Sequence, residues 1–498
     1  MLRFAPAGSG KNFINKSRRF PAALLALGLL FSRPLTAFAE PSAAEQRIET
    51  QRAMEIQSNL TENWPSGPVV TAESAILMEA ETGTVLYAKN IHQHQYPAST
   101  TKILTTLIAA ERCAMDEPVT FSHEAVFDTP RDSNHIAIDE GEILTMEQCL
   151  NAILIRSANE VAFAVAEHIA GDSWHNFADI MNERAKELGC VDSNFVNPNG
   201  LPDENHYTSA YDLAMIGRAF FANEMLCQIT LTKRLDIPPS ENQPDHILEN
   251  NNMQIIPGGK YAYDYLIGCK TGYTDAARSC LVSCAERDGM RLICVVLHDE
   301  APYQYEDTIS LFEYGFGNFE KVNVAQTEKK YDIDSAGLFY GGSDIFGSST
   351  PLLSLNRDDC IILPRTVPFD ETQSTVSYAE TGENLAAVIT YTYHGVTIGK
   401  VRVNFTGRQN QTQIFDSEDG AKDGEDGGKK EKPVIYVNIV RVLIGAACVG
   451  AVVLAVVLIR LFLKNFQFAG WKSRREWKRN NRRRKKARRP NRFRDYDF

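Results

Sequence analysis

A helix is predicted shortly after Pro97, because apolar residues follow it three and four positions apart. Proline suits the first turn of a helix, where its missing N–H needs no partner. The apolar face of this helix consists of Ile103, Leu104, Leu107 and Ile108.

Similar patterns predict the elements on either side of this helix. Strands are expected at Val69 to Met78 and Thr84 to Ala88, joined by a tight turn, and again at Tyr265 to Lys270, Ser279 to Ala285 and Arg291 to Leu297. Helices are expected over 145–170, 174–188, 208–222 and 302–317, and a short polar helix over 43–58. Two strands, several helices and three more strands indicate an α/β (α+β) fold, in which helices cover one antiparallel sheet.

The pattern changes after residue 320 to short strands such as Ala387–Tyr391 and Val396–Val403, which a Tyr-His-Gly turn separates. This segment holds no catalytic grouping. Asp416 to Lys432 is rich in Gly, Asp, Glu and Lys and is typical of a flexible linker.

Both ends of the chain carry membrane signals. Residues 1–39 combine a basic start, a short apolar stretch and Ala37-Phe38-Ala39, which together are typical of a cleaved signal peptide. Val442 to Ile459 contains no charged residue and is predicted to span a membrane once its flanks are added. From Lys464 onwards, 15 basic and 3 acidic residues follow. Positive residues beside a span stay in the cytoplasm, so we expect an extracytoplasmic body and a cytoplasmic tail.

The net charge of −11 conceals this segregation, since the body is acidic and both ends are basic. A basic tail also suits nucleic acid, but behind a membrane span anionic lipid headgroups are the expected partner, so no nucleic acid is predicted. The ten cysteines include no C-x-x-C pair, which disfavours a zinc site. Without a P-loop or a dinucleotide fingerprint, the sequence predicts no cofactor and no metal.

Candidate chemistry lies at the start of the first helix, where Ser99 and Lys102 share one face. A nucleophilic serine needs a neighbouring base, and a buried lysine with a lowered pKa can serve as one. Taken alone, the pair also suits an ordinary surface helix. Two later triplets, Ser157-Ala158-Asn159 and Lys270-Thr271-Gly272, alter the balance, because the ordered set of three is the signature of penicillin-binding proteins and β-lactamases.

The chain resembles a serine-type D-Ala-D-Ala carboxypeptidase, a low-molecular-mass penicillin-binding protein of the S11 peptidase family. Besides the triplets, the resemblance rests on Leu77 to Tyr87, Arg156 to Glu160, Asn197 to Leu201, Lys270 to Thr274 and Ala285 to Arg291. It implies the β-lactamase/transpeptidase-like fold, with the serine opening a helix beside the sheet. It further implies peptidoglycan stem peptides ending in D-Ala-D-Ala as substrates and β-lactam antibiotics as acylating ligands.

The resemblance also implies residue roles. Ser99 would attack the carbonyl between two D-alanines, Lys102 would act as the base, Ser157 would relay a proton and Asn159 would orient the substrate amide. Lys270, Thr271 and Gly272 would bind the substrate on an edge strand. The backbone N–H groups of Ser99 and Tyr273 would form the oxyanion hole.

Two positions depart from the family pattern. Arg278 stands where a small residue is usual, and Glu160-Val161 stands in place of Asp-Ala. Arg278 either assists carboxylate binding in the cleft or points to solvent. The departures bear on substrate preference more than on the reaction.

Two other functions are weighed against the carboxypeptidase. One is a β-lactamase, for which the chain lacks a Glu-bearing loop motif, and the other is a silent peptidoglycan-binding or penicillin-sensing protein, which would not need the full set of polar residues. The expected organisation is 1–39 signal peptide, 40–66 N-terminal leader, 67–318 catalytic domain, 319–413 small β-rich stalk domain, 414–433 charged linker, 434–463 transmembrane helix and 464–498 basic cytoplasmic tail.

Overall fold

The computed structural model describes residues 41–171, 173–329, 353–378 and 384–405. The predicted signal peptide, linker, membrane span and basic tail therefore lie outside the described residues. Within the described ranges, no helix combines the length and the apolar character needed to cross a membrane.

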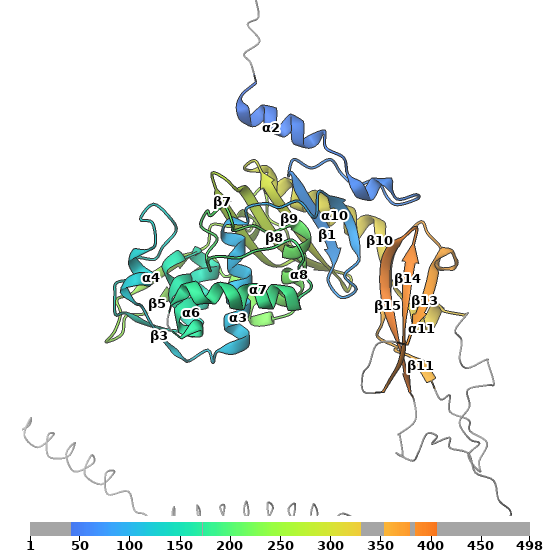
Figure 1. The fold of residues 1–498 in the computed structure, drawn as a ribbon. Helices are drawn as coiled ribbons and strands as arrows, with labels where there is room; N and C mark the ends of the chain where they lie inside the picture. Colours follow the sequence, from blue (N-terminus) through green and yellow to red (C-terminus); the bar gives the residue numbers. More distant parts are fainter. Residues whose placement is uncertain (1–40, 172, 330–352, 379–383, 406–498) are drawn as a thin grey trace, which may run out of the picture. The chain divides into compact units, whose positions relative to one another are not determined.

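The centre of the fold is a five-stranded sheet in the order β2-β1-β9-β8-β7, with every neighbouring pair antiparallel (Figure 1). Its strands come from two segments that lie far apart in the sequence. They are β1 (Ser74–Glu79), β2 (Val85–Lys89), β7 (Leu266–Thr274), β8 (Arg278–Arg287) and β9 (Met290–Asp299). Strands β7, β8 and β9 come from a part of the chain nearly 200 residues after β1. In the strand order, β7, which carries Lys270, lies at the edge of the sheet.

Helices follow one another between and after these strands. They are α2 (Ala43–Arg52), α3 (Lys102–Arg112), α4 (His123–Phe127), α5 (Met146–Asn151), α6 (Asn159–Ala170), α7 (Phe177–Glu187), α8 (Ala210–Phe221), α9 (Glu224–Leu231), α10 (Tyr303–Asn318) and α11 (Val324–Thr327). Helix α8 packs on one face of the sheet, in the cluster that holds α3 and α6, and α10 packs on the other (Figure 1).

Alternation along the central strands explains these two layers. Ile76 and Met78 of β1 belong to the cluster with α3 and α8, whereas Ala75 and Leu77 belong to the cluster with α10. Successive side chains of a strand point to opposite faces, so a strand that is buried along its whole length, as β1 is, has a covering layer on both sides.

Several sequence predictions are refined here. The first strand begins at Ser74 rather than Val69, and the three closing strands are longer than expected. The 145–170 segment is split by a π-helical turn, Ala152–Arg156, and a left-handed residue. Helices α4 and α9 were not predicted, nor were the two-stranded pairs β3 (Pro118–Thr120) with β4 (Ile143–Thr145) and β5 (Arg234–Ile237) with β6 (His246–Glu249).

The predicted strand-rich segment is present between residues 353 and 405. It forms a four-stranded sheet from β11 (Leu353–Leu355), β15 (Val396–Phe405), β14 (Leu385–Tyr393) and β13 (Gln373–Ser377), in that order. Strand β12 (Cys360–Pro364) pairs instead with β10 (Phe319–Asn323). At the β14–β15 turn both His394 and Gly395 have positive φ, as a two-residue hairpin turn requires. The boundaries proposed at 318 and 413 stay predictions.

Candidate active site

Ser99 lies in a tight 3₁₀ turn, Ala98–Thr101, that leads directly into α3. Pro97 precedes this turn, in agreement with the predicted helix start. Lys102 is the first residue of α3, and its Nζ lies 3.0 Å from Ser99 Oγ, as their spacing predicted. Ser99 is partly accessible and Lys102 is fully buried, so the hydroxyl faces the cleft while the amine stands behind it.

Lys102 Nζ also bonds to two neutral acceptors. Asn159 Oδ1 lies 2.7 Å away, and the backbone carbonyl of Asn199 lies 2.7 Å away on another side. Burial lowers the pKa of Lys102 well below its usual value, and the nearby positive charge of Lys270 lowers it further. The negative charge of Glu160 raises the pKa of Lys102, but by less than either burial or Lys270 lowers it. These surroundings therefore favour the neutral form of the amine over the charged one.

Ser157 sits between the π-helical turn and α6 with left-handed backbone angles, φ 63° and ψ 33°. Such a conformation costs a residue with a Cβ energy and is commonly retained at functional sites. It turns the Ser157 side chain toward β7, where Lys270 Nζ donates a hydrogen bond to its Oγ at 3.0 Å. Lys270 also donates to the Thr271 carbonyl at 2.9 Å, and burial lowers the pKa of Lys270 to about 8.

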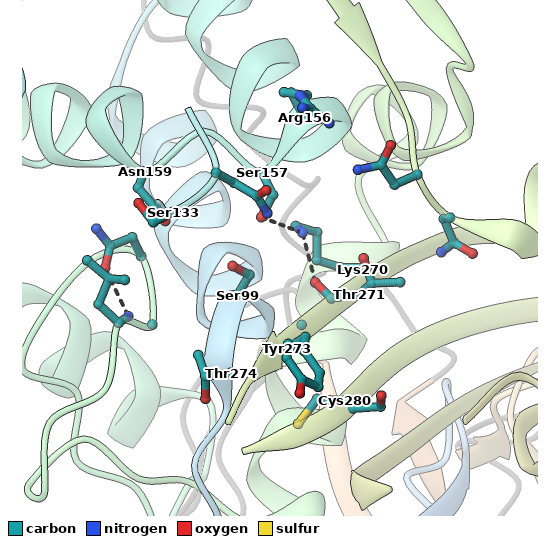
Figure 2. A pocket seen from close by; sticks show the side chains of 18 of the residues that line it. Ser99, Ser133, Arg156, Ser157, Asn159, Lys270, Thr271, Tyr273, Thr274 and Cys280 are labelled. Carbon is teal, nitrogen blue, oxygen red and sulfur yellow. Dashed lines mark hydrogen bonds between the residues drawn. The ribbon is translucent and has the colours of Figure 1, made fainter. Parts of the chain in front are cut away.

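These side chains gather around one cleft of about 760 Å³ (Figure 2). The predicted site residues that line it are Ser99, Ser157, Asn159, Lys270, Thr271, Gly272 and Tyr273. Lys102 lies behind Ser99 and reaches the group through its three hydrogen bonds. The structure thus brings together the residues singled out from three distant stretches of sequence.

Gly272 permits the edge strand to approach the nucleophile. A Cβ at this position would come within 3.0 Å of both Ser99 N and Pro97 O. A side chain on residue 272 would therefore push β7 away from the turn that carries Ser99. This close approach explains why a glycine follows Lys270 and Thr271.

Sequence reasoning missed the part played by the segment at Asn197 to Gly200. Asn197 Oδ1 accepts a hydrogen bond from Gly200 N at 2.7 Å, which closes a turn in which Gly200 has φ +83°. A Cβ on Gly200 would lie 1.8 Å from the carbonyl oxygen of Ala98. Only glycine lets this turn press against the Ser99 turn and aim the Asn199 carbonyl at Lys102. The Asn-Pro-Asn-Gly letters are a turn signal, but they do not reveal the target.

His206 is a second residue that the sequence did not single out. It is buried beside the same turn, where Val196 N–H donates to Nδ1 at 3.1 Å and Thr101 Oγ1 lies 2.9 Å from Nε2. Because Nδ1 accepts, the ring proton resides on Nε2 and is donated to Thr101. Burial lowers the pKa of His206 to about 4, so the ring is neutral near pH 7.

Glu160, one of the two departures from the family pattern, lies at the start of α6 and is buried there. Its Oε1 accepts a hydrogen bond from Ile136 N at 2.7 Å, and the neighbouring Asn159 N–H donates to the Asn134 carbonyl at 2.9 Å. Asn134 lines the cleft, so the start of α6 holds one wall of it. Thr274, at the end of β7, and Asp275, in the turn that follows, line the cleft. Arg278, the other departure, is not among the described residues that line it.

Comparison with known proteins agrees with this geometry. Residues 61–301 match the S11 peptidase family model, described as D-alanyl-D-alanine carboxypeptidase. The chain is 30% identical to the D-alanyl-D-alanine carboxypeptidase DacB2 of Mycobacterium tuberculosis, over 52% of this chain and 86% of that protein. The chain belongs to the S11 family of D-alanyl-D-alanine carboxypeptidases.

Two further relatives place this family membership in context. The chain is 33% identical to the D-alanyl-D-alanine carboxypeptidase DacF of Bacillus subtilis, over 50% of this chain and 63% of that protein. Penicillin-binding protein 5 of Haemophilus influenzae superposes with a TM-score of 0.54 at 24% identity, covering 68% of this chain and 98% of that structure. The second comparison supports the expected penicillin-binding protein fold.

Proposed function

We propose that the chain removes the terminal D-alanine from peptidoglycan stem peptides through an acyl-enzyme on Ser99. The observation that carries this proposal is the set of partners around Lys102 Nζ. A neutral amine has two hydrogens and one lone pair. Asn159 Oδ1 and the Asn199 carbonyl accept the two hydrogens, which leaves the lone pair for the Ser99 hydroxyl.

In the acylation step, Ser99 Oγ attacks the carbonyl carbon between the two D-alanines while its proton passes to Lys102 Nζ. Ser157, which accepts a hydrogen bond from Lys270, relays that proton from Lys102 to the departing amine, so that Lys102 becomes neutral again and Ser157 keeps its hydroxyl. Water then cleaves the ester and restores Ser99. Lys270 and Thr271 bind the terminal carboxylate, and the Ser99 and Tyr273 N–H groups hold the oxyanion. A β-lactam would acylate Ser99 in the same way, but the resulting ester would not be hydrolysed.

The decisive experiment incubates the full-length chain, purified in detergent, with a peptide ending in D-Ala-D-Ala and measures released D-alanine. Mass spectrometry after β-lactam treatment should locate the adduct on Ser99, and Ser99→Ala should lose both the adduct and turnover. An adduct on another residue would refute the assignment. Hydrolysis of the β-lactam at a rate matching peptide turnover would favour the β-lactamase alternative, and β-lactam binding without D-alanine release would favour the silent protein.

We further propose that the body faces the cell exterior, with a membrane span at 434–463 and a cytoplasmic tail that contacts anionic lipids. Support comes from the sequence: a signal-like leader, an uncharged stretch and 15 basic residues after it. Protease treatment of intact cells should spare a tag placed after Phe498. Digestion of the tag while the cells remain sealed would mean that the orientation is wrong.

A further inference from the structure

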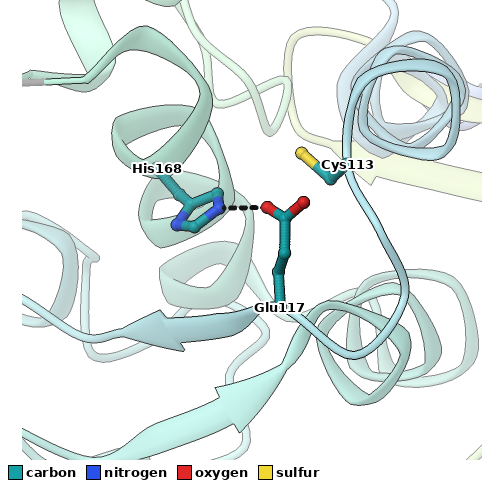
Figure 3. A group of neighbouring side chains, drawn as sticks. All are labelled: Cys113, Glu117 and His168. Carbon is teal, nitrogen blue, oxygen red and sulfur yellow. Dashed lines mark hydrogen bonds and ion pairs between the residues drawn. The ribbon is translucent and has the colours of Figure 1, made fainter.

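Three potential metal ligands meet at the far ends of the helices that begin in the cleft. Cys113 caps the C-terminus of α3, and His168 lies in the last turn of α6. Glu117 stands just before β3 and completes the group (Figure 3). One ligand atom from each of the three lies within 4.8 Å of the others. The described residues contain no other such group of His, Cys, Asp and Glu.

The surroundings hold Glu117 in one position. Its Oε1 accepts a hydrogen bond from Ala114 N at 2.7 Å, while its Oε2 lies 2.9 Å from His168 Nε2. The backbone carbonyls of Met115 and Glu117 accept hydrogen bonds from Glu147 N and Met146 N, at the start of α5, at 2.9 and 2.8 Å. The carboxylate is thus fixed by the fold, with one oxygen directed at the imidazole.

The cluster is also accessible. The side chains of His168 and Glu117 are 28% and 40% exposed, and Cys113 is partly exposed. An ion can therefore enter from solvent without opening the core. The thiol is free rather than part of a disulfide.

We propose that Cys113, Glu117 and His168 form a binding site for Zn²⁺. Sulfur, nitrogen and carboxylate oxygen are the ligand types that zinc takes in proteins, and three protein ligands leave one position for water. On binding, the Cys113 S–H bond breaks, a Zn–S bond forms and the proton goes to solvent. The ion replaces the Glu117–His168 hydrogen bond with two bonds to the metal, for which Nε2 releases its proton and the neutral ring carries its proton on Nδ1.

A metal ion at this site would link α3 and α6, the two helices whose first residues are Lys102 and Asn159. Lys102, at the start of α3, bonds to Asn159, at the start of α6, and the cluster joins the opposite ends of the same two helices. Zinc would thereby stabilise the pair of helices without touching the cleft. No sequence motif indicates this site, because His168 lies 51 residues beyond Glu117 and there is no C-x-x-C pair.

The test measures Zn²⁺ binding to the full-length chain in detergent with a non-thiol reductant. We expect one Zn²⁺ per chain and a rise in the unfolding temperature. Losing a partner outside the ligand shell already weakens metal sites by about 10–100-fold. Cys113→Ser and His168→Gln should therefore weaken binding at least about 100-fold, while Cys360→Ser, which removes another partly exposed thiol, should bind as the wild type does.

Two readouts keep the outcome decisive. Co²⁺ in place of zinc should give a thiolate charge-transfer band that disappears in Cys113→Ser. Acylation by a β-lactam should be normal in that variant, which shows that it is folded, since Cys113 is not part of the cleft. Equal zinc affinity in the wild type and in a folded Cys113→Ser would overturn the proposal, as would a wild-type chain that binds no zinc.

Discussion

Two regions of the protein bury a lysine, and they surround it differently. In the cleft, Lys102 is fully buried among neutral acceptors, and its most influential charged neighbour is a second lysine. Near β2, Lys89 is 1% exposed and donates to the carbonyls of Gln51 and Val70 at 2.8 and 2.9 Å. Two buried carboxyl groups, Asp307 and Asp299, lie in its field.

We expect this difference to separate a lysine that acts as a base from a structural one. Burial lowers the pKa of both amines, but the two carboxyl groups oppose this at Lys89, where the pKa is about 8. At Lys102, the charge of Lys270 adds to the effect of burial. A buried amine without an anion beside it loses its proton readily and can serve as a base. Lys89, which lies near two carboxyl groups, instead connects two segments of backbone. Its amine donates hydrogen bonds to the last turn of α2 and to the chain before β1.

The largest effect is expected at Lys102. Lys102→Ala should slow acylation by a β-lactam by about 10²–10⁴-fold, because proton transfer by a positioned base is typically worth that much. Stopped-flow measurements should show that the initial, non-covalent binding changes far less. Acylation at nearly the normal rate would make Lys102 structural and remove the contrast with Lys89.

Replacing the other lysine should affect stability instead. Lys89→Met keeps the volume but removes the two hydrogen bonds to the carbonyls of Gln51 and Val70, and each hydrogen bond from a charged group is worth about 1.5–3 kcal/mol. Urea denaturation should show this loss, whereas Lys260→Met, at an exposed lysine, should change little. The native Lys89→Met protein should acylate at the normal rate. If catalysis fell while the free energy of unfolding stayed constant, the division of roles would be wrong.

His206 predicts a loss of stability in acid. Its folded pKa of about 4 lies below the ordinary value of 6.5, so the unfolded chain binds the proton more tightly. Its contribution is present above pH 6.5 and is lost as the pH falls toward 4, on the order of 3 kcal/mol in total. Unfolding midpoints between pH 4 and 7 should fall less steeply in His206→Gln than in the wild type. Parallel curves would show that another group titrates.

Near Lys89, the pH dependence of stability should have the opposite sign, because Asp299 stabilises the protein in acid. Burial, and then the charge of Asp307, raises the pKa of Asp299 well above its ordinary value of 3.8. A raised carboxyl pKa contributes stability below pH 3.8, and this is lost as the pH rises through the folded pKa. Asp299→Asn removes the titration while keeping the shape, so its stability should decline less with rising pH. An unchanged slope would contradict this.

These residues also show what the sequence could and could not predict. Ser99 and Lys102 are neighbours on one turn, so their contact follows from helix geometry alone. The Asn199 carbonyl comes from a residue 97 positions later and from the backbone, which has no sequence signature. The contact between Lys270 and Ser157 depends on the order of the sheet, which brings late strands beside early ones. The resemblance implied the residues of the cleft, but not the atoms that hold Lys102.

The elements that were missed have local causes. Strands β3 and β4 are three residues each, too short for alternation to appear. Helix α9 contains Ile229 and Thr230, which are β-branched and favour strands. Strand β1 begins at Ser74 because the preceding Thr71 and Ala72 donate their N–H groups to Asp307 at 2.6 and 2.9 Å, rather than to a neighbouring strand.

The smallest expected effect concerns Arg278, the other departure from the family pattern. It ends the β7–β8 turn with φ 53°, a left-handed conformation that costs a residue with a Cβ roughly 1–2 kcal/mol. Glycine avoids that cost but loses more chain entropy on folding, so Arg278→Gly should stabilise the protein by about 0.5–1 kcal/mol. Arg278→Ala keeps the Cβ and should be nearly neutral. Because Arg278 is not among the described residues that line the cleft, both variants should release D-alanine with an unchanged KM. A raised KM in both, with stability as expected, would show that the guanidinium assists the substrate carboxylate, and the contrast between reactive and structural cations would then have to include this turn.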